Sequence, residues 1–302
     1  MQIRSILLSF VGFMFPLPVN CRIGSGDERR FPMKLQTVLK AIRNADQDYN
    51  LIEPKDKLAV ALSGGKDSML MFLALSMYQK FEGKDFELCA IHVSIADHPE
   101  QDQLMQEFAD KYHLDLHIEK TKIYDILNME KNMKDGRIQC SLCSNLKKGV
   151  LMETAKNLGC NKVVFGHHGD DAMETLLMNM IHGARVSTFS PKQYMSRMDM
   201  TMIRPFVYLT EEQIIEVCRI NQIPSVKPVC PNDGHSERQT MKEMLESIYR
   251  KYPDAHKNFM KALTNREADA LWDPRNVKES RQADADDNTK ASTGSSNIEN
   301  NN

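Results

Sequence analysis

The chain has 302 residues, of which 41% are hydrophobic and 26% are charged, a composition typical of one or two globular domains. Its formal net charge of −2 excludes a basic field over the whole surface, so that any contact with nucleic acid must come from a local patch. Seven cysteines spread over this length exclude a small secreted scaffold held together by disulfides.

The N-terminal segment, residues 1–32, begins with a basic and apolar run that resembles a signal peptide. The run is short for a membrane span and is interrupted by Pro16 and Pro18. A clear helical pattern begins only at Met33. We therefore interpret residues 1–32 as an extension, signal-like or untranslated, and expect a cytoplasmic protein without membrane contact.

Helices and strands are predicted to alternate along the next part of the chain. The predicted helices span 33–50, 67–81, 100–112, 145–158, 170–183 with Gly183 as C-cap, and 211–222 with a Thr210–Gln213 capping box. The predicted strands span 57–62, 86–93, 114–121, 161–168 and 202–208. This alternation predicts an α/β fold, with a doubly wound, mostly parallel sheet covered on both faces.

The C-terminal part of the pattern is helical only, over 236–252 and 255–265. We therefore expect one domain over 33–265, with a helical C-terminal region. Residues 266–302 are too polar to bury a core and are predicted to form a disordered tail.

A glycine-rich loop, SGGKDS at residues 63–68, joins the strand predicted over 57–62 to the following helix. Backbone N–H groups and the positive end of a helix meet at such a loop and favour phosphate. The two glycines permit a tight turn, the serines supply hydroxyls, Lys66 supplies a positive charge, and Asp67 is suited to place magnesium or to cap the helix. The loop matches neither G-x-x-x-x-G-K-[ST] nor G-x-G-x-x-G, which excludes the two commonest nucleotide loops.

A cysteine pair, Cys140 and Cys143, opens a predicted helix with C-x-x-C spacing. Two thiolates at this spacing can share one metal or cluster, and the helix N-terminus lowers the pKa of a thiol. Cys230, in a loop between two predicted helices, is the candidate for a third ligand. The spacing of the pair alone is also compatible with incidental cysteines.

Four separated motifs together carry a family resemblance. SGGKDS resembles the PP-loop signature S-G-G-x-D-S of the ATP pyrophosphatase superfamily, and CSLCSNLKKGVL, GHHGDDAMETLLMNMIHG and IRPFVYLTEEQI follow it in that order. The series resembles the TtcA family, the tRNA 2-thiocytidine synthetases, over about residues 34–263. Near Cys230 the sequence departs from this family, which often carries a second C-x-x-C there.

The resemblance implies an adenine nucleotide α-hydrolase-like fold and an ATP-dependent tRNA sulfurtransferase that releases AMP and pyrophosphate. It implies Mg²⁺, a 4Fe–4S cluster that delivers sulfur, the tRNA anticodon loop as substrate, a sulfur donor such as a cysteine desulfurase, and a homodimer. It assigns nucleotide binding to Ala61, Ser63, Gly64, Gly65, Lys66, Asp67, Ser68, His92, Gly166 and His167. It assigns catalysis to Lys66, Asp67 and Asp171, and cluster ligation to Cys140, Cys143 and Cys230.

Other interpretations of the same residues stay open. The three cysteines with His235 also suit a structural zinc site, and without metal they suit a persulfide relay that closes a disulfide. A PP-loop uridine thiolase and an inert nucleotide- or RNA-binding protein are the alternative functions. Asp170 and Asp171 open a predicted helix and also suit simple capping, with Asp171 the better candidate for function.

Basic side chains provide candidate contacts to phosphate groups. Arg204 is expected either to neutralise phosphate or to form an ordinary ion pair. The candidates for RNA phosphate are Lys147, Lys148, Lys192, Arg197, Arg250, Lys251, Lys257 and Lys261, although each alone is equally compatible with a solvated helix face.

Overall fold

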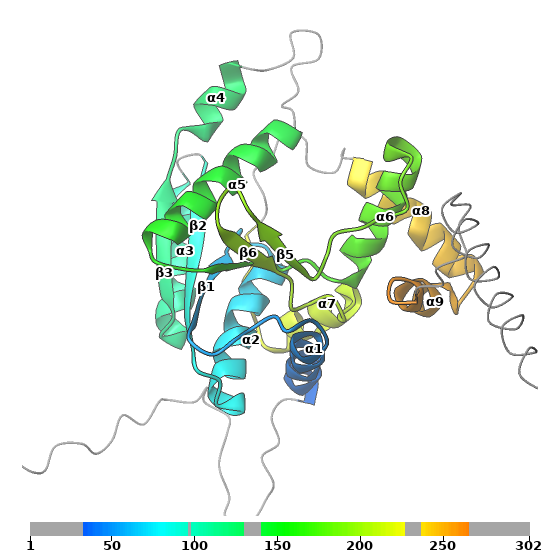
Figure 1. Cartoon of the computed structure of the whole chain (residues 1–302), viewed down its shortest axis with the longest axis horizontal. Helices are drawn as coiled ribbons and strands as arrows, with labels where there is room; N and C mark the ends of the chain where they lie inside the picture. The colour runs from blue at the N-terminus through cyan, green and yellow to red at the C-terminus, as the bar shows by residue number, and fades with distance from the viewer. Residues whose placement is uncertain (1–32, 96–97, 130–139, 227–236, 266–302) are drawn as a thin grey trace, which may run out of the picture.

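The computed structural model describes residues 33–95, 98–129, 140–226 and 237–265 (Figure 1). Its centre is a six-stranded sheet with the order β3-β2-β1-β4-β6-β5. The strands are β1 (Asp56–Ala61), β2 (Phe86–Ser94), β3 (Asp115–Lys120), β4 (Lys162–Val164), β5 (Lys192–Met195) and β6 (Met200–Ile203). All neighbours run parallel except β5 and β6, which are antiparallel, so the predicted mostly parallel sheet is confirmed.

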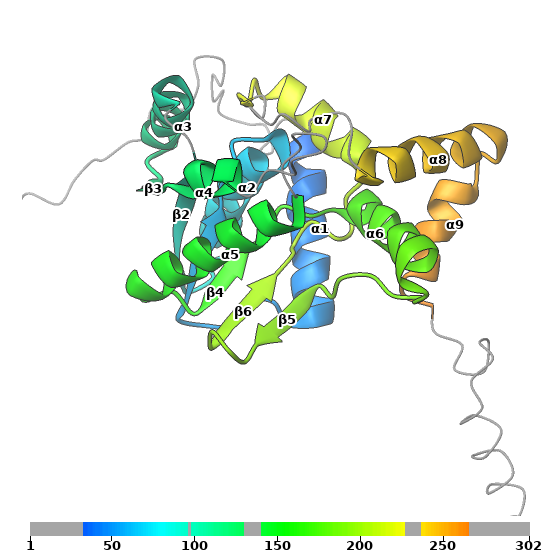
Figure 2. The same cartoon turned by 90° about the horizontal axis from the view of Figure 1, so that it is seen from above.

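Helices cover both faces of the sheet (Figure 2). They are α1 (Met33–Tyr49), α2 (Lys66–Glu82), α3 (Pro99–Tyr112), α4 (Ile123–Met129), α5 (Cys140–Asn157), α6 (Gly169–Gly183), α7 (Glu211–Ile220), α8 (Glu237–Lys251) and α9 (Ala255–Ala262). Buried residues of α1, α2, α3 and α7 belong to one core cluster, and those of α5 belong to a second cluster with the opposite side of the strands. Both views place α6, α8 and α9 together beside the sheet.

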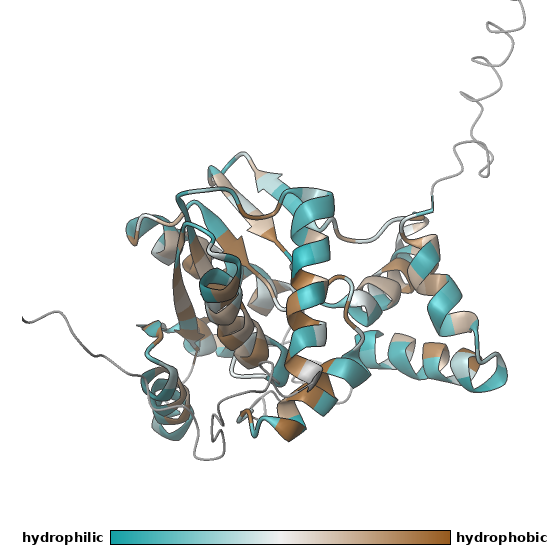
Figure 3. Ribbon diagram, turned by 90° about the horizontal axis from the view of Figure 1, so that it is seen from below, coloured by the Kyte–Doolittle hydropathy of each residue, from teal (hydrophilic) through white to brown (hydrophobic). Residues whose placement is uncertain are grey.

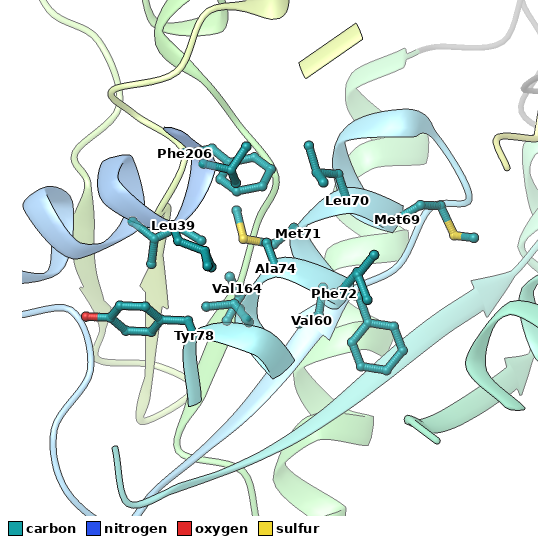
Figure 4. Packing of buried hydrophobic residues seen from close by; sticks show 14 of the residues in the cluster. Leu39, Val60, Met69, Leu70, Met71, Phe72, Ala74, Tyr78, Val164 and Phe206 are labelled. Atoms are coloured by element: carbon teal, nitrogen blue, oxygen red, sulfur yellow. The ribbon is translucent and has the colours of Figure 1, made fainter. Parts of the chain in front are cut away.

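The two cores follow from the alternation of side chains along the strands. Leu58 and Val60 of β1 pack into the first core, whereas Ala59 between them packs into the second. Helix α2 is buried nearly all round, because it lies between the sheet and helices α1 and α7 (Figure 4). Figure 3 shows this helix, between α3 and α1, as mainly hydrophobic, whereas α1 also carries a hydrophilic side. A helix that is apolar on most sides is expected in such a buried position.

The strand boundaries correct the sequence prediction in two places. The strand predicted over 161–168 ends at Val164, and the strand predicted over 202–208 covers Met200–Ile203. The residues after β4 form a loop that lines the candidate site, and the loop after β6 places Phe206 and Leu209 in the first core. Strand β5 is absent from the prediction, because it is polar and lies at the edge of the sheet with a single neighbour.

The helix predictions need smaller corrections. Helix α5 begins at Cys140, which confirms that the cysteine pair opens a helix and corrects the start predicted near residue 145. The short helix α4 is an addition. The left-handed C-cap of α6 is Ala184 (φ 47°) rather than Gly183, whereas the Thr210–Gln213 capping box is confirmed. None of the helices within the described ranges is long and apolar enough to cross a membrane. The predicted extension 1–32 and tail 266–302 lie outside the described residues.

Candidate active site

A pocket of about 360 Å³ opens where strands β1, β2 and β4 end. The strand order reverses between β1 and β4, and open α/β sheets bind ligands at such a switch point. The pocket is lined by eight of the residues predicted from the sequence: Ala61, Ser63, Asp67, Ser68, His92, Gly166, His167 and Asp171. Three predicted residues, Gly64, Gly65 and Lys66, lie in the same loop but outside the lining.

The glycine-rich loop is held in shape by its own serines. The Ser68 hydroxyl donates to the Gly65 carbonyl oxygen at 3.0 Å and accepts from the Ser63 amide at 3.2 Å. Gly64 has a φ of 82°, a left-handed conformation that favours glycine. Helix α2 begins directly after Gly65, so its positive end points at the pocket side of the loop. The loop therefore offers an anion a positive, preformed contact.

Gly166 allows the strand end of β4 to approach this loop closely. A Cβ atom at this position would lie 3.1 Å from the carbonyl carbon of Asp67 and 3.2 Å from the amide nitrogen of Ser68. Because these are backbone atoms of the first turn of α2, a side chain here would displace the loop. The sequence prediction that Gly166 borders the nucleotide is consistent with this close packing.

Lys66 and Asp67 form a charged pair at the start of α2. The Lys66 Nζ lies 3.3 Å from Asp67 Oδ2 and 3.0 Å from Glu211 Oε1. Burial by itself lowers the pKa of Lys66, but the two carboxylates outweigh it and raise that pKa, so the ammonium stays charged. Burial raises the pKa of Asp67, whose Oδ1 is buried without a hydrogen-bond partner among the described residues. A buried carboxylate oxygen without a partner is costly, which makes it a candidate ligand for a cation.

Asp171 is held through both of its oxygens. Its Oδ2 accepts a hydrogen bond from the His168 amide at 3.0 Å, which caps α6, and its Oδ1 pairs with Arg238 at 2.8 Å. Capping and a position in the pocket wall therefore coexist at this residue. The neighbouring Asp170 faces away from the pocket, because it accepts from the Glu211 amide at 2.7 Å and pairs with His256 at 2.5 Å.

Two histidines line the pocket in neutral form. Burial lowers the pKa of His92, whose Nδ1 lies 2.8 Å from the Leu62 carbonyl oxygen and therefore donates to it. Burial lowers the pKa of His167 to about 4. The His167 ring stacks on Phe165, with centroids 5.6 Å apart. Neutral rings with fixed orientations suit the binding of a base or ribose better than the neutralisation of phosphate.

Arg204 supports His167 and does not line the pocket. Its guanidinium lies over Phe165 and Phe189, donates to the Ser190 carbonyl oxygen at 2.5 Å and approaches His167 Nδ1 at 3.3 Å. Burial lowers its pKa to about 10. Arg204 is thus buried and stacked on two aromatic rings, whereas the sequence predicted that it neutralises phosphate or forms an ordinary ion pair.

The cysteine pair stands at the start of α5, and this helix also forms one wall of the pocket. Cys140 is exposed, and Cys143 packs partly against Ile123 and Leu127 of α4. The same helix contributes Ser144, Lys147, Lys148 and Leu151 to the pocket lining. Within the described ranges, three or more metal-binding side chains are not grouped together, and Cys230 lies outside those ranges.

Lys147 and Lys148 line the pocket beside the glycine-rich loop, a position that the sequence did not predict; their contact with RNA phosphate stays a prediction. The sequence contains an indication of this position, because Cys140, Ser144 and Lys147 are spaced so that they lie on one face of α5. Lys192 bonds instead to the Asn50 carbonyl oxygen at 2.6 Å. Outside the pocket lining lie Arg197, Arg250, Lys251, Lys257 and Lys261.

The family of the chain follows from its similarity to known proteins. The family model of the PP-loop domain matches residues 33–245. The tRNA-cytidine(32) 2-sulfurtransferase of Geotalea uraniireducens is 36% identical over 236 residues, which cover 78% of this chain and 93% of that protein. This chain is a PP-loop protein of the TtcA family.

A second relative agrees with this family, and a solved structure shows the same fold. The tRNA-cytidine(32) 2-sulfurtransferase of Methylobacillus flagellatus is 31% identical over 256 residues, or 83% of this PP-loop protein and 84% of the relative. The U34-tRNA thiolase NcsA from Methanococcus maripaludis, solved with its [4Fe-4S] cluster, superposes with a TM-score of 0.61 at 19% identity. The superposition covers 78% of this chain and 80% of the NcsA chain, and it shows that the two proteins share a fold.

Proposed function

We propose that this PP-loop protein is a tRNA sulfurtransferase that activates a cytidine with ATP and replaces the carbonyl oxygen of its base with sulfur. The observation that carries the proposal is that one helix, α5, begins with the cysteine pair and then lines the pocket of the glycine-rich loop. The names of the relatives support cytidine 32 of tRNA as the target. A sulfur donor, a homodimer and a cytoplasmic location belong to the same proposal.

The first step is the transfer of AMP to the base. The loop from Ser63 to Ser68 is suited to hold the pyrophosphate part of ATP, and His92 and His167 border the remainder of the pocket. The carbonyl oxygen of cytidine attacks the α-phosphorus, the bond to the β-phosphate oxygen breaks, and pyrophosphate leaves. Lys147 and Lys148 face the same pocket and would neutralise the charge of this transition state.

Magnesium fits beside this step. The Asp67 Oδ1 oxygen is buried and accepts no hydrogen bond within the described part of the chain, with His168 Nε2 3.9 Å away, and Asp171 lines the same pocket. Carboxylate oxygens are the protein ligands that Mg²⁺ prefers. When bound, the ion would neutralise phosphate charge, and Asp67 and Asp171 would be its protein contacts.

The second step forms the carbon–sulfur bond and expels AMP together with the former carbonyl oxygen. Cys140 and Cys143 are separated by one helical turn at the N-terminus of α5, a spacing at which two cysteines can share one metal or cluster. With Cys230 they would make the three-thiolate set of a 4Fe–4S cluster. When bound, such a cluster would supply the sulfur for this step. The protein then has to position the activated base and exclude water.

The cysteine set is tested by metal content and by nucleoside analysis. We expect anaerobically purified protein to contain iron and acid-labile sulfide, and Cys140→Ala, Cys143→Ala and Cys230→Ala each to abolish 2-thiocytidine in tRNA. Cys160→Ala is the matched control, because Cys160 is buried in the core of the sheet. One zinc per chain without iron would favour the zinc site, and full thiolation by metal-free protein would favour the persulfide relay.

The nucleotide step is tested by the products of ATP. Wild-type protein with tRNA should release AMP and pyrophosphate, and Lys66→Ala should slow this release strongly. An inert nucleotide- or RNA-binding protein would release neither product. Mass spectrometry of the thiolated nucleoside separates cytidine from uridine as the target.

A further inference from the structure

Helix α8 supplies a pair of cations that reach the loop and the pocket wall from outside the sheet. Arg238 and Lys242 are four residues apart, so they lie on the same face of α8, one turn from each other. Arg238 bonds to Asp171 of α6 and Lys242 pairs with Glu211 of α7, and Figures 1 and 2 both show α8 beside α6. Neither side chain lines the nucleotide pocket. Arg238 contacts Asp171, which does line it, and Lys242 contacts Glu211, the partner of Lys66 in the glycine-rich loop.

The first connection runs from Lys242 through Glu211 to Lys66. Lys242 Nζ lies 2.6 Å from Glu211 Oε2, and Glu211 Oε1 lies 3.0 Å from Lys66 Nζ. Glu211 is itself fixed at the first turn of α7, where its amide donates to Asp170 at 2.7 Å. Burial alone would raise the pKa of Glu211, but hydrogen bonds from Lys242 and Lys66 lower it to about 2. Glu211 is therefore a permanently charged bridge between α8 and the loop lysine.

The second connection runs from Arg238 to Asp171. One guanidinium nitrogen lies 2.8 Å from Asp171 Oδ1 and 3.2 Å from Glu174 Oε2, and the other donates to the Thr175 hydroxyl at 3.3 Å. Because Asp171 Oδ2 already caps α6, Arg238 fixes the remaining oxygen. The planar fork of arginine suits this double contact, whereas a lysine would make only a point contact.

We propose that Arg238, Lys242 and Glu211 are positioning residues for the nucleotide step, with α8 holding Asp171 directly and Lys66 through Glu211. The inference rests on the proposed function, because it assigns a role in AMP transfer. Lys66 has a long and flexible side chain, and holding it before ATP arrives removes the cost of ordering it in the transition state. Ion pairs that are partly exposed contribute little to stability. A role in positioning therefore accounts better for the Lys242–Glu211, Glu211–Lys66 and Arg238–Asp171 pairs.

The Lys66 connection is tested by a double-mutant cycle. Glu211→Gln keeps the shape of the side chain but removes its charge, and Glu212→Gln is the matched control, because Glu212 is the exposed neighbour on the same turn. We expect Glu211→Gln to lower kcat for AMP release by about ten-fold or more, the loss typical of a hydrogen bond to a charged group, with a smaller change in the KM for ATP. In a Lys66→Ala background the same substitution should have no further effect.

The Arg238 connection is tested in the same assay with Arg238→Gln, Arg238→Lys and the control Arg219→Gln, which changes an exposed arginine in the last turn of α7. We expect Arg238→Gln to lower kcat, Arg238→Lys to recover only part of it, and the control to match wild type. Multiplicative losses in the Lys66 cycle, or a Glu211→Gln variant equal to Glu212→Gln, would overturn the proposal.

A failure of this inference can be distinguished from a failure of the proposed function. If wild-type protein releases no AMP from ATP with tRNA, the proposed function fails. In that case the same cycle, measured as equilibrium binding of α,β-methylene-ATP, still tests the connection. Equal affinities for wild type, Lys66→Ala and Glu211→Gln would then refute the positioning of Lys66. Urea unfolding of each variant separates a lost fold from a lost geometry.

Discussion

Replacement of Gly64 by alanine is a sharp test of how the glycine-rich loop is built. The residue has a φ of 82°, and a left-handed conformation costs an ordinary residue about 1–2 kcal/mol. The new Cβ would also lie 3.1 Å from Val226 Cβ and 3.3 Å from Met105 Sδ. Val226 cannot withdraw freely, because its amide donates to the Gly64 carbonyl oxygen at 2.8 Å. Overpacking adds about 1–3 kcal/mol, so we expect a loss of stability of roughly 2–5 kcal/mol.

Gly83→Ala is the matched control for this substitution. Gly83 also has a positive φ, of 61°, but a Cβ there would meet no atom within 4 Å. Gly83→Ala should therefore lose only the stability that the left-handed conformation costs, about 1–2 kcal/mol. Urea unfolding of both variants measures the difference, and binding of α,β-methylene-ATP reports the loop itself. If Gly64→Ala is no less stable than Gly83→Ala, the argument from crowding against Val226 is wrong.

Three further substitutions test separate parts of the molecule. Burial, with the nearby carboxylate of Asp171, raises the pKa of Glu174 to about 7; the protonated form therefore stabilises the fold at low pH, and this contribution is lost as the pH rises through 7. As the pH rises from 5 to 8, we expect the free energy of unfolding of Glu174→Gln, measured with urea, to increase relative to that of wild type. A difference between the two proteins that does not change with pH would contradict the assigned pKa. Gly149→Ala, on an exposed position of α5 with nothing within 4 Å of the new Cβ, should raise the free energy of unfolding by about 0.5–1 kcal/mol. Arg204→Lys should lower it by about 1–3 kcal/mol, and it should weaken binding of the ATP analogue through His167; unchanged values would mean that the stacked guanidinium is dispensable.

Local sequence patterns predicted the central elements because their signals are short-range. The loop at 63–68 is marked by glycines directly after an apolar strand, and the Thr210 capping box is marked by two residues of one turn. Strand ends were predicted less well. The apolar residues after β4 and β6 look like continued strand, but Phe165 lines the pocket and Phe206 packs in the first core. Only the neighbouring strands determine where pairing stops.

The site residues also divide into those marked by a local motif and those whose partners are distant in the sequence. Residues with a distinctive local motif, such as Ser63, Asp67 and Asp171, were predicted to bind nucleotide or act on it, and the structure brings them to one pocket. Lys147 was predicted only as an RNA contact: its spacing places it on the same helix face as Cys140, but only the packing of α5 shows that this face lines the pocket. Glu211 and Arg238 were not predicted as site residues, since each acts through a partner more than 60 positions away in the sequence.

By itself, the sequence determined the chemistry that this PP-loop protein has available. The glycines, hydroxyls and lysine of SGGKDS specify a contact for phosphate, and the spacing of Cys140 and Cys143 specifies two thiolates on one helical turn. Both are properties of a few consecutive residues. The tertiary structure decided which groups act together, because parallel strands separated by whole helices end at the same edge of a sheet. Only the packing of α5 on the strands places two lysines in the pocket, and only the packing of α8 on α6 links Lys66 and Asp171 to a helix that is distant in the sequence.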